Sequence, residues 1–278
     1  MKTRKIKDVL LYGLMAAALA AVLAALAGIL IYILKSSAGY IGPSLFAPGS
    51  GEGIFPMIVT TLYVVLVSLA AALPAGIMTA VFLNEYAGNS GGIRLLRLAI
   101  ETLAGIPSIL YGLFGLLVFC RLFKLGQSIA AGALTLSIMI LPVIIRTTEE
   151  ALKAIPDSFR EGSLSLGATK LQTIVHVILP QALPGIVTSA ILAAGRVAGE
   201  SAPVLLTVGL TRNMPKSIFD SGRTLTIHLY YLTKEAIRPE DFGSAFATAA
   251  VLVAIVIIIN TATKILSSRF KKTSGEGQ

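Results

Sequence analysis

Two side chains of opposite charge, Arg196 and Glu200, lie four residues apart in one of the most apolar stretches of the sequence, AAGRVAGESAPVLL over residues 193–206. On a helix this spacing puts both on one face, where they can meet. An arginine near the centre of a membrane helix costs about 2.5–3.5 kcal/mol, so an ionisable residue there predicts a functional site. The alternative is a buried ion pair that only locks two helices together.

The chemistry that such a pair offers is recognition of an oxyanion. The planar guanidinium of arginine donates parallel hydrogen bonds that match the oxygens of an oxyanion. A carboxylate beside it repels an anion, but it accepts a hydrogen bond from an oxyanion that still carries a proton. Phosphate carries one near neutral pH and sulfate does not, so we hypothesise that Glu200 selects protonated oxyanions.

The composition places the pair in a membrane protein. Of the 278 residues, 55% are hydrophobic and only 13% are charged, against about 25% charged in soluble domains. The net charge of +9 comes from basic residues that cluster at the ends of apolar segments, a pattern typical of membrane orientation rather than of nucleic-acid binding. With one cysteine and no metal-ligand or nucleophile–base spacing, the sequence predicts no metal, no cofactor and no enzyme.

Six apolar segments are long enough to cross a bilayer, which takes about 20 residues. The first follows a basic N-terminus like that of a signal peptide, but its apolar run from Val9 to Leu34 exceeds the roughly 7–15 residues of a secretory core, so we read it as a retained anchor. The six predicted spans are 9–34, 56–83, 98–119, 127–145, 183–208 and 244–266.

Basic residues between the spans fix the predicted orientation. With the N-terminus inside, fourteen of the 23 Lys and Arg residues fall on inner segments, eight on outer ones and one, Arg196, within a span, so both termini are predicted to be cytoplasmic. The chain is then a single permease domain, 1–278, with a cytoplasmic loop at 147–182 and an extracytoplasmic loop at 209–243. Four basic residues of the outer loop are expected to form a solvated charged surface, Arg212, Lys216, Arg223 and Arg238.

Four of the predicted spans are interrupted by proline, at Pro74, Pro107, Pro142 and Pro203. A proline inside a membrane helix leaves carbonyl groups that must be satisfied elsewhere, and broken helices usually line a protein interior or a wet cavity. A packing kink explains any one proline, but four of them favour a transport pathway. Two polar residues of the third span are further pathway candidates, Glu101 and Ser108.

The predicted cytoplasmic loop contains the stretch SFREGSLSLGATKLQTIVHVILP, residues 158–180. Ser158 with Glu161, and Thr169 with Gln172, have the form of capping boxes. Gly167 between them suits the left-handed residue that ends a helix. The spacing therefore predicts a short helix, a glycine turn and a second helix that ends at Pro180.

This stretch resembles the cytoplasmic motif of integral subunits of ABC importers: Glu-Ala-Ala, three residues, Gly, nine residues, Ile, one residue, Leu-Pro. All of the spacings are kept, with Gly-Ser in place of Ala-Ala and Val in place of Ile. The matching residues are Glu161, Gly162, Ser163, Gly167, Val177, Leu179 and Pro180. The resemblance implies that this loop docks on an ATP-binding subunit. The chain itself has no GxxxxGK[ST] phosphate loop, so ATP hydrolysis is assigned to another subunit.

Two further stretches resemble the phosphate-specific (Pst-type) permeases. GRVAGESAPVLL resembles their R-A-x-G-E-x-A-P-L motif, and LAGIPSILYGLFG, residues 103–115, resembles their L-A-G-x-P-S-I-x-Y-G-L-F-G motif. The length and the short N-terminus are more like the A subunit than the C subunit. The resemblance implies an all-α, polytopic fold of the type I, MetI-like class with six transmembrane helices, in a bacterial or archaeal inner membrane. It also implies that Arg196 and Glu200 act in phosphate passage.

The implied partners are a homologous C-type permease, two copies of an ATP-binding subunit and an extracytoplasmic phosphate-binding protein. Two alternatives stay open from the residues themselves. One is the same machine for another oxyanion, molybdate or sulfate, because the cytoplasmic loop fits equally well. The other is a self-contained ion-coupled carrier that uses the Arg196–Glu200 pair as a gate.

Overall fold

The computed structural model describes residues 2–47, 53–88, 90–237 and 242–275, and within these ranges the regular structure is helical. Most elements are α-helices, three are π-helical turns (η2, η3, η4) and one is a 3₁₀ turn (η1). Their order is α1 Lys2–Ser37, η1 Pro43–Phe46, α2 Phe55–Val81, η2 Phe82–Tyr86, α3 Gly91–Gly105, α4 Ser108–Gly115, η3 Leu116–Leu122, α5 Ile129–Lys153, α6 Asp157–Ser165, α7 Lys170–Thr173, η4 Ile174–Ile178, α8 Leu179–Gly199, α9 Ala202–Thr207, α10 Leu225–Glu235 and α11 Phe242–Gly275.

Among the described residues, five helical segments are long and apolar enough to cross a membrane. The third predicted span, 98–119, is not one continuous helix, because α3 and α4 meet at an angle of 101°. The predicted number of six is reached only when this bent pair is counted as one span. The other predicted spans coincide in large part with α1, α2, α5, α8 and α11.

The bend between α3 and α4 follows from Pro107, which has no backbone N–H and disfavours helical geometry in the residue before it. Ile106 and Pro107 are accordingly extended, with ψ angles of 131° and 136°. The hydroxyl of Tyr111 donates a 2.7 Å hydrogen bond back to the carbonyl of Leu103. The same carbonyl, which cannot pair with Pro107, also accepts the backbone N–H of Ile106 at 3.2 Å, so it is satisfied inside the protein as a break in an apolar environment requires.

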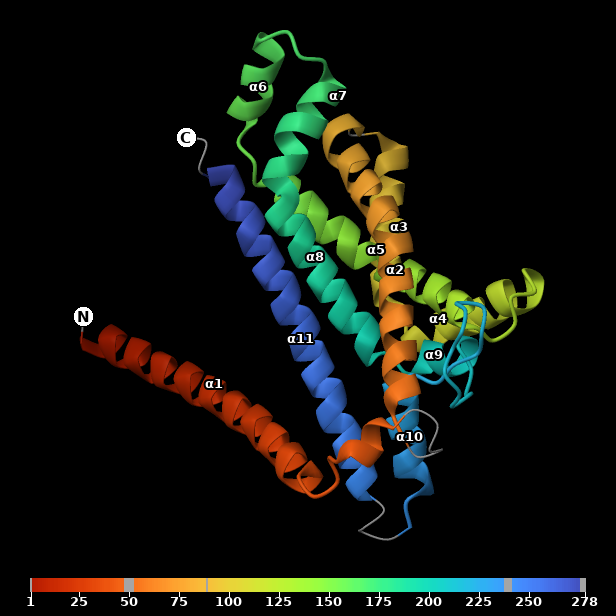
Figure 1. Ribbon diagram of the computed structural model, residues 1–278. Coiled ribbons are helices and arrows are strands. Elements are labelled where there is room, and N and C mark those ends of the chain that lie inside the picture. The colour runs from red at the N-terminus through yellow and green to blue at the C-terminus, as the bar shows by residue number, and fades with distance from the viewer. Residues whose placement is uncertain (1, 48–52, 89, 238–241, 276–278) are drawn as a thin grey trace.

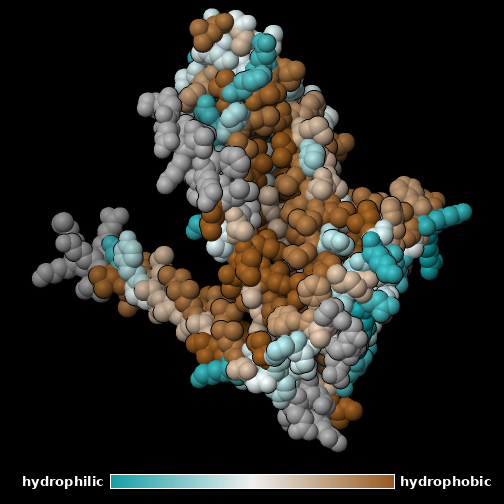
Figure 2. Space-filling view, in the orientation of Figure 1, coloured by the Kyte–Doolittle hydropathy of each residue, from teal (hydrophilic) through white to brown (hydrophobic). Residues whose placement is uncertain are grey.

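The helices surround α5 (Figure 1). Its most apolar window is 72% buried, whereas that of α1 is 0% buried. The helix α5 packs against α2 and α8, and α11 packs along α8. By contrast, α1 extends away from the bundle and packs against α11 (Figure 1). Brown, apolar surface covers much of the visible face (Figure 2), which fits a chain surrounded by lipid.

The fifth predicted span has different limits in the structure. It was predicted at 183–208, after a helix ending at Pro180, but α7, η4 and α8 form one continuous helical segment from Lys170 to Gly199. Pro180 lies inside this segment, in the first turn of α8 after the π-helical turn Ile174–Ile178, so this proline does not end the helix. At the other end the helix stops at Gly199, and α9 begins only at Ala202.

Candidate functional site

Arg196 and Glu200 do meet, at the end of a helix rather than in its middle. Arg196 lies in the last turn of α8, and Glu200 is the first residue beyond it, with an extended backbone (ψ 137°). The Nε atom of Arg196 lies 3.8 Å from Oε1 of Glu200. A positive charge in the last turn is favoured by the helix dipole. The side chain of Arg196 is 36% exposed and that of Glu200 is 17% exposed. The pair is therefore partly buried, and Arg196 is the more exposed of its two members.

The two motifs that resemble phosphate-specific permeases lie against each other. Gly112 of α4 faces the start of α9 so closely that a Cβ atom on it would lie 2.9 Å from the Cα atom of Pro203. Tyr111 beside it belongs to the same buried apolar cluster as Val197 and Val204. The break between α3 and α4 and the break between α8 and α9 are thus packed together, with the Arg196–Glu200 pair at the second of them.

The predicted extracytoplasmic loop, 209–243, contacts the break between α8 and α9. The hydroxyl of Thr226, in α10, donates a 2.9 Å hydrogen bond to the backbone carbonyl of Glu200. One residue earlier, the backbone N–H of Leu225 donates a 3.0 Å hydrogen bond to Oγ1 of Thr61 in α2. The start of α10 is therefore bonded both to the break at Glu200 and to α2.

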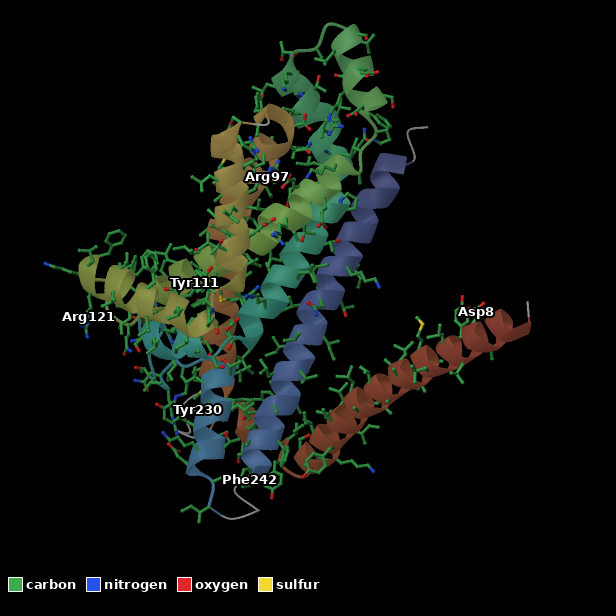
Figure 3. All side chains as sticks on the ribbon, turned by 180° about the vertical axis from the view of Figure 1, so that it is seen from behind. Asp8, Arg97, Tyr111, Arg121, Tyr230 and Phe242 are labelled. Carbon is green, nitrogen blue, oxygen red and sulfur yellow. The ribbon has the colours of Figure 1, made fainter. Side chains whose placement is uncertain are left out.

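The two further pathway candidates, Glu101 and Ser108, are not bonded to Arg196 among the described residues. Glu101, in α3, has a 60% exposed side chain and forms a 3.0 Å ion pair with Arg146 of α5. Ser108 is the first residue of α4, directly after the bend, and is partly exposed. In the part of the chain that the structure describes, no hydrogen bond or ion pair joins either residue to Arg196. Figure 3 shows Tyr111 near the middle of the molecule and Arg97 on α3 closer to α6.

The stretch with the importer motif forms the opposite end of the molecule, called here the α6 end (top of Figure 1). Gly167 has the predicted left-handed backbone, φ +85°. The capping box of Thr169 and Gln172 is confirmed, with bonds of 2.8 and 3.3 Å. The predicted capping box at Ser158 is wrong, because Pro156 occupies the N-cap position and Ser158 lies inside α6.

The motif residues themselves lie on both sides of the glycine turn. Three are in α6, Gly167 forms the turn, and the remaining three lie in η4 and the first turn of α8. Around them, three apolar side chains of the short helix and turn are solvent-exposed, Phe159 at 39%, Leu164 at 49% and Leu166 at 91%. Exposed apolar side chains grouped on a short helix are typical of a surface that another protein covers.

Sequence reasoning missed a buried basic group at the other end, near α10. Arg223 was expected on a solvated surface, but it is only 8% exposed, donates to the Leu210 carbonyl and stacks on the ring of Tyr231. His228 is 4% exposed. Burial, with the nearby charges of Arg223 and Arg212, lowers the pKa of His228 to about 4. Arg238, the fourth basic residue predicted there, lies outside the described residues.

Comparison with known proteins assigns the chain to a protein family. The family described as "Binding-protein-dependent transport system inner membrane component" matches residues 72–272. The chain is 34% identical to the probable ABC transporter permease protein YqgI of Bacillus subtilis (strain 168), over 97% of this chain and 98% of that protein. It is 36% identical to the phosphate transport system permease protein PstA of Mycobacterium leprae (strain TN), over 78% and 72%.

A solved structure shares the fold. In the crystal structure of a bacterial alginate ABC transporter in complex with its alginate-bound periplasmic protein, one chain superposes with a TM-score of 0.72 at 18% identity. The match covers 96% of both chains. This likeness is one of fold, and it confirms the all-α, polytopic architecture of an ABC importer permease expected from the sequence.

Proposed function

Since this chain belongs to the family of binding-protein-dependent transport system inner membrane components, we propose that it is the permease subunit of an ABC importer that moves inorganic phosphate across the cytoplasmic membrane. The observation that carries the choice of substrate is the partly exposed Arg196–Glu200 pair at the helix break. A guanidinium that is not saturated by its carboxylate partner can still donate to an oxyanion. The chain's similarity to a PstA protein supports phosphate as that oxyanion.

The position of the pair supports a role in passage rather than in static packing. A break in a helix presents free backbone groups and a change of direction, and such breaks line paths through membrane proteins. Here two breaks, at Pro107 and at Glu200, lie against each other through Gly112 and Pro203. Arg196 is proposed to attract the anion there, and Glu200 to accept a hydrogen bond from an oxyanion that carries a proton. Glu101 and Ser108 are proposed as secondary groups along the same path.

The proposed partners are ATP-binding subunits, a second permease and a binding protein. The sequence has no phosphate loop for ATP, so ATP-binding subunits, proposed as two copies, would dock on the α6 end through the seven residues of the importer motif. A homologous C-type permease would complete the path, and an extracytoplasmic binding protein would deliver phosphate. The chain would act as one permease domain, 1–278, with 147–182 and both termini cytoplasmic and 209–243 outside.

Radiolabelled phosphate uptake tests the proposal, in cells that lack other phosphate importers and express the complete transporter with this chain. Uptake that requires the chain, and that excess unlabelled phosphate but not sulfate or molybdate suppresses, is the expected result. Suppression by molybdate or sulfate alone would assign the machine to another oxyanion. Uptake that persists after removal of the ATP-binding subunit would instead indicate a self-contained carrier.

A further inference from the structure

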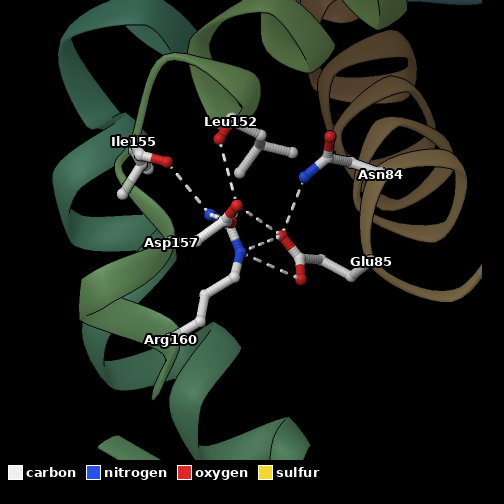
Figure 4. A network of polar contacts seen from close by, with 6 residues as sticks. All are labelled: Asn84, Glu85, Leu152, Ile155, Asp157 and Arg160. Carbon is white, nitrogen blue, oxygen red and sulfur yellow. Dashed lines mark hydrogen bonds and ion pairs between the residues drawn. The ribbon is translucent and has the colours of Figure 1, made fainter. Parts of the chain in front are cut away.

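A buried ion pair joins the short helix α6 to the inner part of the bundle (Figure 4). Arg160 of α6 donates to the carboxylate of Glu85, in the π-helical turn that ends α2, with Nη2 to Oε1 at 2.9 Å and Nε to Oε1 at 3.2 Å. The side chains are only 17% and 7% exposed. The two residues are 75 positions apart in sequence, so no local pattern predicts their contact.

The same guanidinium also fixes the end of α5. Its Nη1 donates to the Ile155 carbonyl at 3.0 Å and its Nη2 to the Leu152 carbonyl at 3.1 Å. These carbonyls belong to the last turn of α5 and the residues that follow it, where helices leave acceptors without partners. One rigid, planar group therefore bonds three segments at once: α6, the end of α2 and the end of α5.

The other contacts of α6 are with the segments that continue into α8. Its neighbours in packing are α7 and η4, which continue into α8. Through these contacts alone, a push on α6 would reach α8. Arg160 adds a direct connection to α2 and α5, the two helices that pack most extensively on each other in the bundle. Leu83, two residues before Glu85, and Leu152, whose carbonyl Arg160 bonds, are fully buried members of one apolar cluster, so both ends of the pair are connected to the core.

From this arrangement we infer that Arg160 and Glu85 are positioning residues for coupling: they make α6 and the ends of α2 and α5 one rigid body, so that movement of a docked ATP-binding subunit reaches the transport path. The inference rests on the proposed function. Without the pair, α6 would still dock and ATP would still be hydrolysed, but the spans would follow α6 incompletely. Coupling, rather than assembly, is the property that the pair controls.

The test compares Glu85→Gln with Asp157→Asn in the complete transporter, purified and reconstituted into vesicles. Asp157 is a matched control, because it pairs with the same guanidinium at 3.0 Å but is 84% exposed. Phosphate taken up per ATP hydrolysed is expected to fall about tenfold or more in Glu85→Gln and less than twofold in Asp157→Asn. Glu85→Asp, which keeps the charge with a shorter reach, is expected to give an intermediate ratio in a fully assembled complex.

A second measurement is independent of the substrate. Spin labels on Ser158 of α6 and Met78 of α2, both exposed, are placed in a Cys120→Ala background. In the protein that keeps the Arg160–Glu85 pair, the distance between the two labels is expected to be the same with and without nucleotide. In Glu85→Gln, this distance is expected to shift on nucleotide binding. A separation that shifts equally in both proteins, or an unchanged uptake per ATP in Glu85→Gln and Glu85→Asp, would overturn the inference. Failure of the wild-type transporter to take up phosphate would refute the proposed function, while the label separation would still decide on rigid coupling.

Discussion

Gly112 and Pro203 lie in direct contact, close enough that even a methyl group on Gly112 would approach the Cα atom of Pro203 to 2.9 Å and the carbonyl oxygen of Ala202 to 3.3 Å. Both neighbours are backbone atoms, so they cannot rotate away as a flexible side chain would. The contact holds the two broken helices together beside the Arg196–Glu200 pair. The shape of the candidate path therefore depends on the absence of a side chain at one position.

Gly112→Ala is expected to destabilise the protein by about 1–3 kcal/mol, the usual cost of overfilling a packed site. The measurement is the thermal unfolding of the detergent-solubilised protein, followed by loss of the monodisperse species. Gly28→Ala in α1 is the matched control, because a Cβ there meets nothing within 4 Å and alanine is the better helix former. Equal melting temperatures for the two variants would contradict the close contact.

Arg196→Gln is expected to reduce phosphate uptake at least tenfold, because glutamine keeps a hydrogen-bond donor but loses the charge and the paired donors. Uptake is measured at matched membrane levels of the assembled transporter. Arg121→Gln, at an exposed arginine in η3, is the control and should leave uptake within about twofold. Normal uptake by an assembled Arg196→Gln transporter would reduce the pair to a structural role.

Glu200→Gln is expected to weaken the discrimination between phosphate and sulfate. The amide offers a donor where the carboxylate offered only acceptors, so a fully deprotonated oxyanion is no longer repelled. The measurement is competition of unlabelled sulfate against labelled phosphate uptake, with sulfate becoming an inhibitor in the variant. If the variant takes up phosphate normally and still ignores sulfate, Glu200 does not recognise the proton of the oxyanion.

His228 is expected to make the protein less stable in mild acid. Its pKa of about 4 in the folded protein lies below the ordinary value of 6.5, so below pH 6.5 the unfolded chain takes up a proton that the folded chain resists. Stability therefore falls as the pH is lowered from about 6.5 towards 4, by about 3 kcal/mol at most. His228→Gln should flatten the change of melting temperature between pH 7 and pH 5, whereas His176→Gln, at an exposed histidine, should not. Identical pH profiles for wild type and His228→Gln would contradict this assignment.

Sequence reasoning reached the features that depend on neighbours along the chain. Gly167 and the capping box of Thr169 and Gln172 are local, and both are found as predicted. The capping box predicted at Ser158 is absent because Pro156 occupies the N-cap position, two residues before Ser158. Pro107 signalled an interruption, but the 101° angle between α3 and α4 depends on what each helix packs against.

The contacts that sequence reasoning missed join residues far apart in the chain. The Arg160–Glu85 pair connects two helices separated by four others, and nothing in either local sequence marks the partner. Arg223 resembles any basic residue of a polar loop, and only the arrangement of the loop on the bundle buries it. Spacing along one helix identified Arg196 and Glu200, but whether their charges are shielded or exposed depended on where α8 ends.

The contrast between α1 and α5 has a consequence for how this sequence can vary. The apolar window of α5 is 72% buried and that of α1 is 0% buried within this chain. A change of size in α5 must be absorbed by packed neighbours, whereas α1 contacts this chain mainly where it packs on α11, as Tyr32 does on Phe246, and elsewhere one apolar residue of α1 can replace another with little effect on the same chain. A scan of all single substitutions should therefore find α5 intolerant and α1 permissive. Any position of α1 outside its contact with α11 that proves intolerant would then mark a surface on which a different molecule, rather than this chain, imposes the constraint.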